Sequence, residues 1–368
     1  MTSGGINMAE MTAKERIMNA IMGKEVDRVP WSPFLAYYWE HLPAEERSCG
    51  QVEYMRKMGA DPLLRGFGLL FRTELRNCDC SVRRDGNREY RTYSTKVGSL
   101  TEVRTYSPTA DSWFLTGHAV QAEEDFKILQ YIMENMAVYE DPAYCENEYR
   151  TLGENAVFVP SVGIHSKTAF QSLVEQWCGT EALVYALCDF PEAVEECLAV
   201  MQERDMETVR YSVQSSIDIF NFFEDSSTTN ISPALFAKYT APEINAWGKM
   251  IHAEGKLLLH HACGHLKDLL PLIAETDIDI LESISPPPTG NVELADCAKV
   301  LLEHIAMIGG IEPTFFKDCT MDGLEKCVSS LLDCMKGRRY VLANSDSCPP
   351  GVAYEKFLLV SELVRKHR

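Results

Sequence analysis

Short apolar segments alternate with stretches of helical pattern from residue 156 to the end of the chain, and this alternation constrains the fold most strongly. The apolar segments are expected to be strands, at residues 156–160, 218–223, 256–260, 279–281, 305–308 and 340–343. Helices are predicted between and after them, at about residues 168–178, 191–214, 266–273, 292–302, 321–335 and 354–366. Repeated strand–helix units of this kind predict a parallel sheet whose faces are covered by helices.

Two more apolar segments, at residues 29–35 and 63–67, raise the expected number of strands to about eight. Eight units in a chain of 368 residues predict an α/β fold of the closed (β/α)8 TIM-barrel type, with residues 1–368 as a single domain. The alternative is an open doubly wound sheet, which usually has a glycine-rich phosphate-binding turn after its first strand. The sequence contains no G-x-G-x-x-G or G-x-x-x-x-G-K-S/T motif, which argues against that alternative and against a nucleotide cofactor.

Two segments near the N-terminus fall outside this pattern. Residues 1–11 are polar, lack the apolar stretch of a secretory signal and are expected to be a disordered leader. Between about residues 76 and 120, alternating segments are broken by turn residues, which predicts an antiparallel β-hairpin insertion. Within it, residues 90–96 and 100–106 are expected to pair across Gly98-Ser99.

Charge and cysteine content narrow the range of partners and compartments. The formal net charge of −19 argues against nucleic acid or an anionic membrane as the main partner. No run approaches the roughly 18 apolar residues of a membrane span. The chain has 13 cysteines, an odd number, and shows no export signal, so we expect free thiols and a cytoplasmic location.

Polar residues follow several predicted strands, at the end where a TIM barrel carries its active site. They are His165, Glu224-Asp225, residues 260–263, Glu282 and residues 344–348. Side chains two positions apart on a strand face the same way, so His261 and Cys263 would present an imidazole and a thiolate at the barrel mouth. Cys348 follows another strand that can return to the same mouth. These three residues are a candidate zinc site with an open fourth position.

Glu224 and Glu282 are the candidate catalytic carboxylates, because each follows an apolar strand and has no packing role there. Either could also fill the fourth position on zinc. A metal-free interpretation stays open, since His-x-Cys pairs are common by chance and residues 345–350 could simply form a loop. A non-enzymatic barrel that binds a small ligand is therefore a further alternative.

Aromatic residues follow the first predicted strand, where they could stack on a flat ligand or only cover the end of the barrel. They are Tyr37, Tyr38 and Trp39. Phe222, which precedes the carboxylate Glu224, and His165 are expected to line the same site.

Several segments resemble the uroporphyrinogen decarboxylase superfamily, and together they extend over nearly the full chain. They are residues 11–16, 27–30, 224–227, 231–233, 260–265, 279–281 and 309–311. The fold of that superfamily is a (β/α)8 barrel, which agrees with the strand count.

The superfamily contains two chemistries. Its decarboxylases carry an Arg-Gln-Ala-Gly-Arg stretch that grips tetrapyrrole carboxylates, whereas residues 31–38 here read Trp-Ser-Pro-Phe-Leu-Ala-Tyr-Tyr. Its other branch comprises zinc-dependent methyltransferases that work with corrinoid proteins and carry His-x-Cys with a distant Cys. His261, Cys263 and Cys348 match that signature, and residues 282–290 resemble the methyl-ether branch used in bacterial O-demethylation.

The resemblance thus implies a zinc-dependent methyltransferase that moves a methyl group between a small substrate, such as a methoxylated aromatic, and a cobalamin-type corrinoid. The corrinoid would be carried by a separate partner protein, since the chain has no Asp-x-His-x-x-Gly cobalamin motif. The alternative within the superfamily is a metal-free porphyrinogen decarboxylase. Whether the protein forms a homodimer is left open.

Overall fold

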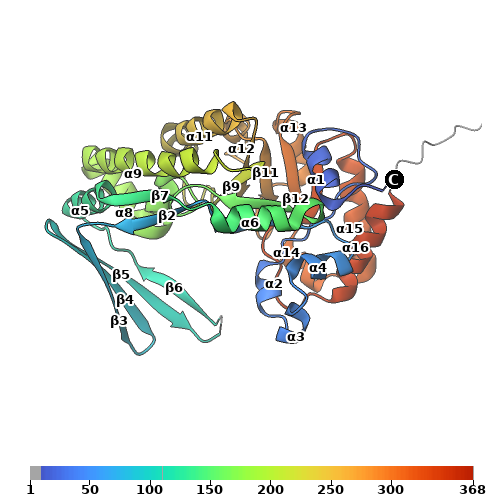
Figure 1. Cartoon of the computed structure of the whole chain (residues 1–368), viewed down its shortest axis with the longest axis horizontal. Coiled ribbons are helices and arrows are strands. Elements are labelled where there is room, and N and C mark those ends of the chain that lie inside the picture. Colours follow the sequence, from blue (N-terminus) through green and yellow to red (C-terminus); the bar gives the residue numbers. More distant parts are fainter. Residues whose placement is uncertain (1–9, 110, 368) are drawn as a thin grey trace, which may run out of the picture.

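A curled parallel sheet forms the centre of the computed structural model, which describes residues 10–109 and 111–367 (Figure 1). Its seven strands lie side by side in the order β1 (Leu63–Leu69), β8 (Val157–Ser161), β9 (Ile219–Glu224), β10 (Leu257–Ala262), β11 (Ile280–Ile284), β12 (Ala306–Ile311) and β13 (Tyr340–Asn344). Seven of the eight predicted strands are therefore confirmed.

The eighth predicted strand, at residues 29–35, is reduced to a single parallel bridge between Trp31 and Leu342. Around it, the Ser32 N–H donates to the Leu342 carbonyl at 2.9 Å, and the Asp61 N–H donates to the Trp31 carbonyl at 2.7 Å. The segment is thus bonded to β13 on one side and to the residues before β1 on the other. Pro30 and Pro33 lack the N–H groups that a longer strand would need. The arrangement is compatible with a TIM-like barrel.

Inward-facing side chains of the sheet form a compact apolar core together with the first helix, α1 (Ala13–Ile21). Its members include Val159, Leu259, Ile308 and Val341 from the strands, and α1 adds Ile17, Ala20 and Ile21. A capping box begins α1, since the Thr12 hydroxyl accepts from the Glu15 N–H and the Glu15 carboxylate accepts from the Thr12 N–H. Met11 is tied to the barrel as well, because its N–H donates to Asp27 at 3.0 Å. Residues 1–9 of the expected leader lie outside the described residues.

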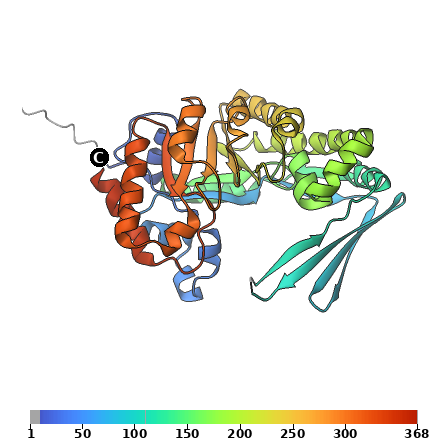
Figure 2. The same cartoon turned by 180° about the vertical axis from the view of Figure 1, so that it is seen from behind.

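Helices cover the outer face of the sheet (Figures 1 and 2). The longer ones are α6 (Ala143–Leu152), α8 (Thr180–Asp189), α9 (Pro191–Ser212), α11 (Ala241–Ala253), α15 (Met321–Cys334) and α16 (Tyr354–Lys366). Shorter ones are α2 (Ala36–Glu40), α3 (Ala44–Arg47), α4 (Gln51–Lys57), α10 (Pro233–Leu235), α12 (Leu270–Ile273), α13 (Leu294–Val300) and α14 (Pro313–Asp318). Irregular helical turns are η1 (Gly153–Asn155), η2 (Leu173–Cys178) and η3 (Phe236–Thr240).

The six predicted helices are all present, two of them in altered form. The helix predicted at residues 168–178 is a short α-helix, α7 (Ala169–Ser172), that continues as the π-helical turn η2. The helix predicted at residues 266–273 begins only at Leu270, because Pro271 has no N–H to bond to the preceding turn.

The predicted insertion is an antiparallel sheet of β3 (Cys78–Asp85), β4 (Arg88–Thr95), β5 (Gly98–Ser107) and β6 (Ser112–Gly117), which we call the β-arm. The β-arm stands apart from the helices that cover the central sheet (Figures 1 and 2). It is joined to the rest of the protein through β2 (Phe71–Leu75), β7 (Met136–Glu140) and α5 (Glu123–Glu134). Residues 90–96 and 100–106 pair as expected, but Thr95 faces Gly98, so the turn is at residues 96–97. Gly98 suits its position because it has φ +146, and a Cβ there would also lie 2.4 Å from Ile128 Cδ1 of α5.

All 13 cysteines are free thiols, as expected. Within residues 10–109 and 111–367, no helix is both long enough and apolar enough to span a membrane.

Candidate functional site

His261 stands near the end of β10, on the inward face of the sheet, between Phe223 of β9 and Glu282 of β11. It is buried, and its Nδ1 lies 2.9 Å from Glu282 Oε2. An ionised carboxylate only accepts hydrogen bonds, so Nδ1–H donates and the Nε2 lone pair is left free. Nε2 lies 3.9 Å from Asp346 Oδ1, in the loop after β13.

Glu282 connects His261 to a second buried group, since its other carboxylate oxygen forms an ion pair with Arg65 of β1. Burial alone would raise the pKa of Glu282, but Arg65 and His261 together hold this pKa below its usual value. The next residue, Ser283, has φ +78 and forms a bulge between β11 and β12. Bulges of this kind re-aim neighbouring side chains next to functional sites.

Two aromatic rings border His261. The ring of Phe223 lies 4.7 Å from the imidazole centroid and that of Phe34 lies 5.7 Å from it. The Arg65 guanidinium sits over the ring of Phe34 at 4.6 Å. Both rings are partly exposed, so they form an apolar border around the free nitrogen of His261.

Cys263 follows β10 directly and lies two residues after His261. If the alternation of the strand continues, the two side chains point to the same face. Its thiol contacts the Glu224 carbonyl oxygen at 3.5 Å. Burial raises the pKa of Cys263, and the nearby carboxylates Asp346 and Asp225 raise it further. The thiol is therefore protonated at neutral pH unless a cation binds it, and the surrounding negative charge favours a cation.

Gly264 allows the chain to turn directly after Cys263. It has φ +87, and a Cβ at this position would lie 2.6 Å from Ser227 Cβ and 2.7 Å from Asp225 Oδ1. Only glycine fits this turn without strain.

Cys348 is fully buried in the loop after β13. Its N–H donates to the Phe34 carbonyl at 2.8 Å, and its carbonyl accepts from the Tyr38 N–H at 2.9 Å. Across residues 10–109 and 111–367, no three His, Cys, Asp or Glu side chains are gathered closely enough to hold a metal ion. The structure thus places Cys263 just past the end of β10, two residues after His261, and does not bring Cys348 into a three-ligand cluster with them.

The residues fit a zinc ion in part. A metal-binding histidine characteristically donates its other ring N–H to a carboxylate, as His261 does to Glu282. Imidazole nitrogen and thiolate sulfur are the donors that zinc prefers. A third donor is not in place, and Asp346 is the carboxylate that faces the free nitrogen.

Glu224 belongs to a different group, on the outward face of β9. In the register it pairs with Ala262, not with His261. Its carboxylate accepts from the Thr168 N–H at 2.8 Å and from the Ser226 hydroxyl at 3.2 Å, and it lies 3.7 Å from His260 Nε2. Burial disfavours its charge, but His260 and the hydrogen bond from Thr168 keep the pKa of Glu224 below its usual value.

Two more buried carboxyl groups, Asp205 of α9 and Glu243 of α11, lie behind Glu224. Asp205 accepts from the Ile164 N–H at 2.7 Å, and Glu243 accepts from the Ala169 N–H at 3.0 Å. Burial raises the pKa of Asp205 to about 7, and burial beside Asp205 raises the pKa of Glu243 well above its usual value. Together with Glu224, they hold the loop after β8.

The predicted substrate-binding residues are scattered. Tyr37 is exposed, Trp39 packs on Tyr54, and Tyr38 is buried with its hydroxyl 3.3 Å from that of Tyr54. Phe222 is fully buried on the outward face, stacked on His260 at 4.4 Å. His165, in the loop after β8, contacts Trp177, and burial lowers the pKa of His165 to about 4, so it is neutral at pH 7.

Sequence reasoning did not single out Arg65 or Phe34, two of the residues that surround His261, whereas Asp346 falls within the predicted strand-end residues 344–348. Strand parity carried a signal for Phe223, because it lies one residue before Glu224 and directly beside His261 in the register. Arg65 and Phe34 come from distant segments and carry no local signal.

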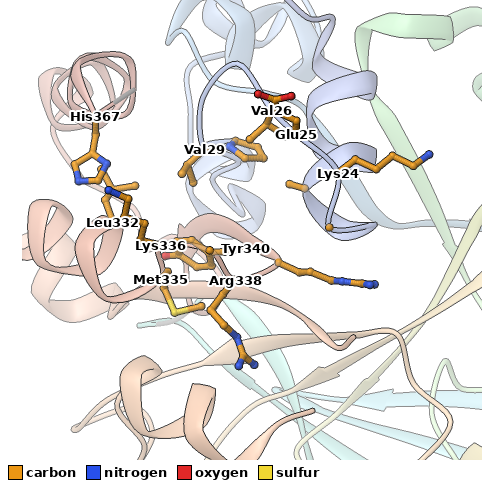
Figure 3. A pocket seen from close by; sticks show the side chains of 15 residues that line it. Lys24, Glu25, Val26, Val29, Leu332, Met335, Lys336, Arg338, Tyr340 and His367 are labelled. Carbon is orange, nitrogen blue, oxygen red and sulfur yellow. The ribbon is translucent and has the colours of Figure 1, made fainter. Parts of the chain in front are cut away.

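A separate pocket of about 420 Å³ lies at the opposite end of the sheet, before the start of β13 (Figure 3). Basic residues line it, among them Lys24, Lys336 and Arg338. The side chains of Lys24 and Arg338 point in different directions, so they do not converge on one anion (Figure 3).

Comparison with solved structures identifies the fold. A methyltransferase from Methanosarcina mazei aligns over 97% of this chain and 99% of its own, with 14% identity and a TM-score of 0.61. A B12-independent methionine synthase from Shewanella sp. W3-18-1 aligns over 92% of this chain and 98% of its own, with 10% identity and a TM-score of 0.47. The first similarity supports the fold, and the second is too weak to support a conclusion.

No curated protein matches the sequence. Residues 167–367, more than half of the chain, match the family model described as Uroporphyrinogen decarboxylase (URO-D). This segment includes the strand-end residues His261, Cys263, Glu282 and Cys348. The chain therefore belongs to the uroporphyrinogen decarboxylase (URO-D) family.

Proposed function

We propose that this protein is a methyltransferase of the zinc- and corrinoid-dependent branch of its family. It would move a methyl group between a small, flat substrate, such as a methoxylated aromatic, and a corrinoid carried by a separate protein. The observation that carries the proposal is His261, whose Nδ1 is fixed by Glu282 while its Nε2 stays free, two residues before Cys263.

The role of zinc rests on these donors. His261 and Cys263 would hold the ion, and the third ligand would come from the loop after β13. Cys348 is the third ligand implied by the resemblance, while Asp346 is the carboxylate already 3.9 Å from His261 Nε2. When bound, zinc supplies a Lewis acid that lowers the basicity of an ether oxygen as the methyl group leaves.

The protein's own residues would orient the site and exclude water from it. Arg65 and Glu282 fix the imidazole plane of His261 and keep its Nδ1 protonated. Phe34 and Phe223 offer ring faces to a flat substrate beside His261. The Arg65 guanidinium is already paired with Glu282, so a neutral substrate suits this border better than a polyanion does.

Metal analysis of the purified protein, together with a spectral assay of methylcobalamin formation, tests the proposal. The assay mixes the protein with reduced corrinoid protein and a panel of methoxyarenes. We expect about one zinc per chain in the wild type. His261→Ala and Cys263→Ala should lose both zinc and methyl transfer, whereas Cys188→Ser, at an exposed thiol on α8, should keep both.

Two further variants identify the third ligand, since zinc content falls in Cys348→Ser or in Asp346→Asn according to which residue binds. Release of carbon dioxide from uroporphyrinogen, without methyl transfer from any methoxyarene, would instead assign the decarboxylase chemistry of the family.

A further inference from the structure

The β-arm ends in two strands whose outer sides have no partner strand among residues 10–109 and 111–367. Its strand order is β3-β4-β5-β6, so β3 and β6 are the edges. Figures 1 and 2 show no strand except β5 beside β6. An open edge carries unpaired N–H and C=O groups and is a template for pairing with another chain.

The two edges differ in how they are protected. Four of the eight residues of β3 are charged, which is the usual defence of a free edge. None of the six residues of β6, Ser-Trp-Phe-Leu-Thr-Gly, is charged. Phe114 at its centre is 50% exposed. The β6 edge is therefore open, apolar and undefended.

The β-arm is fixed to the body of the protein. Leu100 of β5 is buried in the main core, and Tyr93 of β4 packs on Trp177 at 5.6 Å. Within the β-arm itself, Arg104 of β5 donates a hydrogen bond to the buried Glu102 of the same strand at 3.1 Å. An edge held in place in this way loses little conformational entropy on binding.

Charge distribution indicates which partner β6 suits. Residues 78–117 contain six basic and five acidic side chains, a net charge of +1, so the rest of the chain carries −20. Two copies of this protein repel each other through their barrels. Their nearly neutral β-arms are where they can approach at the lowest electrostatic cost.

The geometry of β6 is also self-complementary. When two antiparallel strands are related by a two-fold axis normal to the sheet, opposite residues lie on the same face. An axis at Phe114 places it opposite Phe114 of the partner subunit, and places Trp113 opposite Leu115 of the partner subunit. Aromatic and large apolar pairs of this kind stabilise sheets. The bulge at Thr116 limits the regular pairing to the residues before it.

We propose that the protein forms a homodimer through β6, in which two β-arms join into one continuous eight-stranded antiparallel sheet. The proposal names the interface and its register, and it does not depend on the proposed methyl transfer.

Sedimentation velocity on the full chain, over a range of protein concentrations, tests the dimer. We expect the wild type to be dimeric and Phe114→Lys to raise the dimer dissociation constant at least about tenfold, because the substitution places two like charges face to face at the axis. Val82→Lys is the matched control, since Val82 is 53% exposed on the other edge, β3. Circular dichroism checks that both variants are folded.

Cysteine cross-linking tests the register. Phe114→Cys should form a disulfide-linked dimer on mild oxidation, seen on a non-reducing gel, and Val82→Cys should not. A monomeric wild type at every concentration would overturn the proposal. A dimer that survives Phe114→Lys, or that is lost equally in Val82→Lys, would overturn the assignment to β6.

Discussion

His261 Nδ1 and Glu282 Oε2 lie 2.9 Å apart on the neighbouring strands β10 and β11, and Glu282 is at the same time paired with Arg65 of β1. The three residues are buried and belong to three strands of one sheet. The Glu282 carboxylate thus orients the His261 imidazole and also balances the positive charge of Arg65.

Replacing Glu282 should affect both stability and metal binding. Glu282→Gln leaves a buried Arg65 without its counter-charge, so the free energy of unfolding should fall by about 3 kcal/mol. Loss of the carboxylate behind His261 should weaken zinc binding about 10- to 100-fold. Chemical denaturation and competition with a chelator measure the two effects.

The double variant Arg65→Met/Glu282→Leu separates the two effects. Because it removes both charges, it should recover most of the lost stability while zinc binding stays weak. Recovery of zinc binding in the double variant would contradict the role given to Glu282.

The buried pair Asp205 and Glu243 should make stability depend on pH. The pKa of Asp205 is raised by burial to about 7, above its value of about 3.9 in an unfolded chain. The folded state therefore holds a proton that the unfolded state has lost, and this contribution to stability falls as pH rises from about 4 to about 7.

Asp205→Asn keeps a neutral oxygen for the Ile164 N–H and should remove this slope. The measurement is the difference in unfolding free energy between variant and wild type at pH 5 and at pH 8. Asp189→Asn, at an exposed position on α8, should leave the wild-type slope unchanged. An equal slope in Asp205→Asn and wild type would mean that Asp205 carries no extra proton in the folded state.

Gly264→Ala should distort the turn after Cys263. The new Cβ would lie 2.6 Å from Ser227 Cβ in a backbone with φ +87. Gly255→Ala is the control, because Gly255 has φ +68 but no atom within 4 Å of the new Cβ. We expect Gly255→Ala to cost about 1 kcal/mol of stability, and Gly264→Ala to cost a further 1–3 kcal/mol, about the usual cost of overpacking. Thermal unfolding and zinc content report the two consequences, and equal losses in both variants would show that Cys263 is not displaced.

The barrel strands could be predicted from sequence because parallel strands covered on both faces are continuous apolar runs. Residues 29–35 gave the same signal, but Pro30 and Pro33 reduce that segment to one bridge. The helix predicted at residues 168–178 starts where Glu224 and Glu243 accept from the N–H groups of Thr168 and Ala169. Such caps come from distant residues, so no local pattern reveals them.

Strand parity explains much of the difference between the predicted and observed site. It predicts that His261 and Cys263 share a face; the register extends to Ala262, and Cys263 follows it directly. The same rule places Phe223 beside His261 and turns Glu224 to the outward face, where it bonds to Thr168. Arg65 could not be predicted, because β1 lies at one end of the strand order and reaches Glu282 of β11 only through the curl of the sheet.

The last prediction concerns substrate binding and uses two adjacent phenylalanines. Phe223 borders His261 with a ring separation of 4.7 Å and is partly exposed, whereas Phe222 is fully buried against His260 and Trp247. Phe223→Leu removes the ring face offered to a methoxyarene, so its KM should rise about tenfold while the free energy of unfolding changes little. Phe222→Leu changes packing behind the sheet, so it should lower the free energy of unfolding by about 1 kcal/mol and leave KM unchanged. Steady-state kinetics and chemical denaturation of both variants give the comparison. A KM that rises in Phe222→Leu and not in Phe223→Leu would move the substrate to the outward face, beside His260 and Glu224.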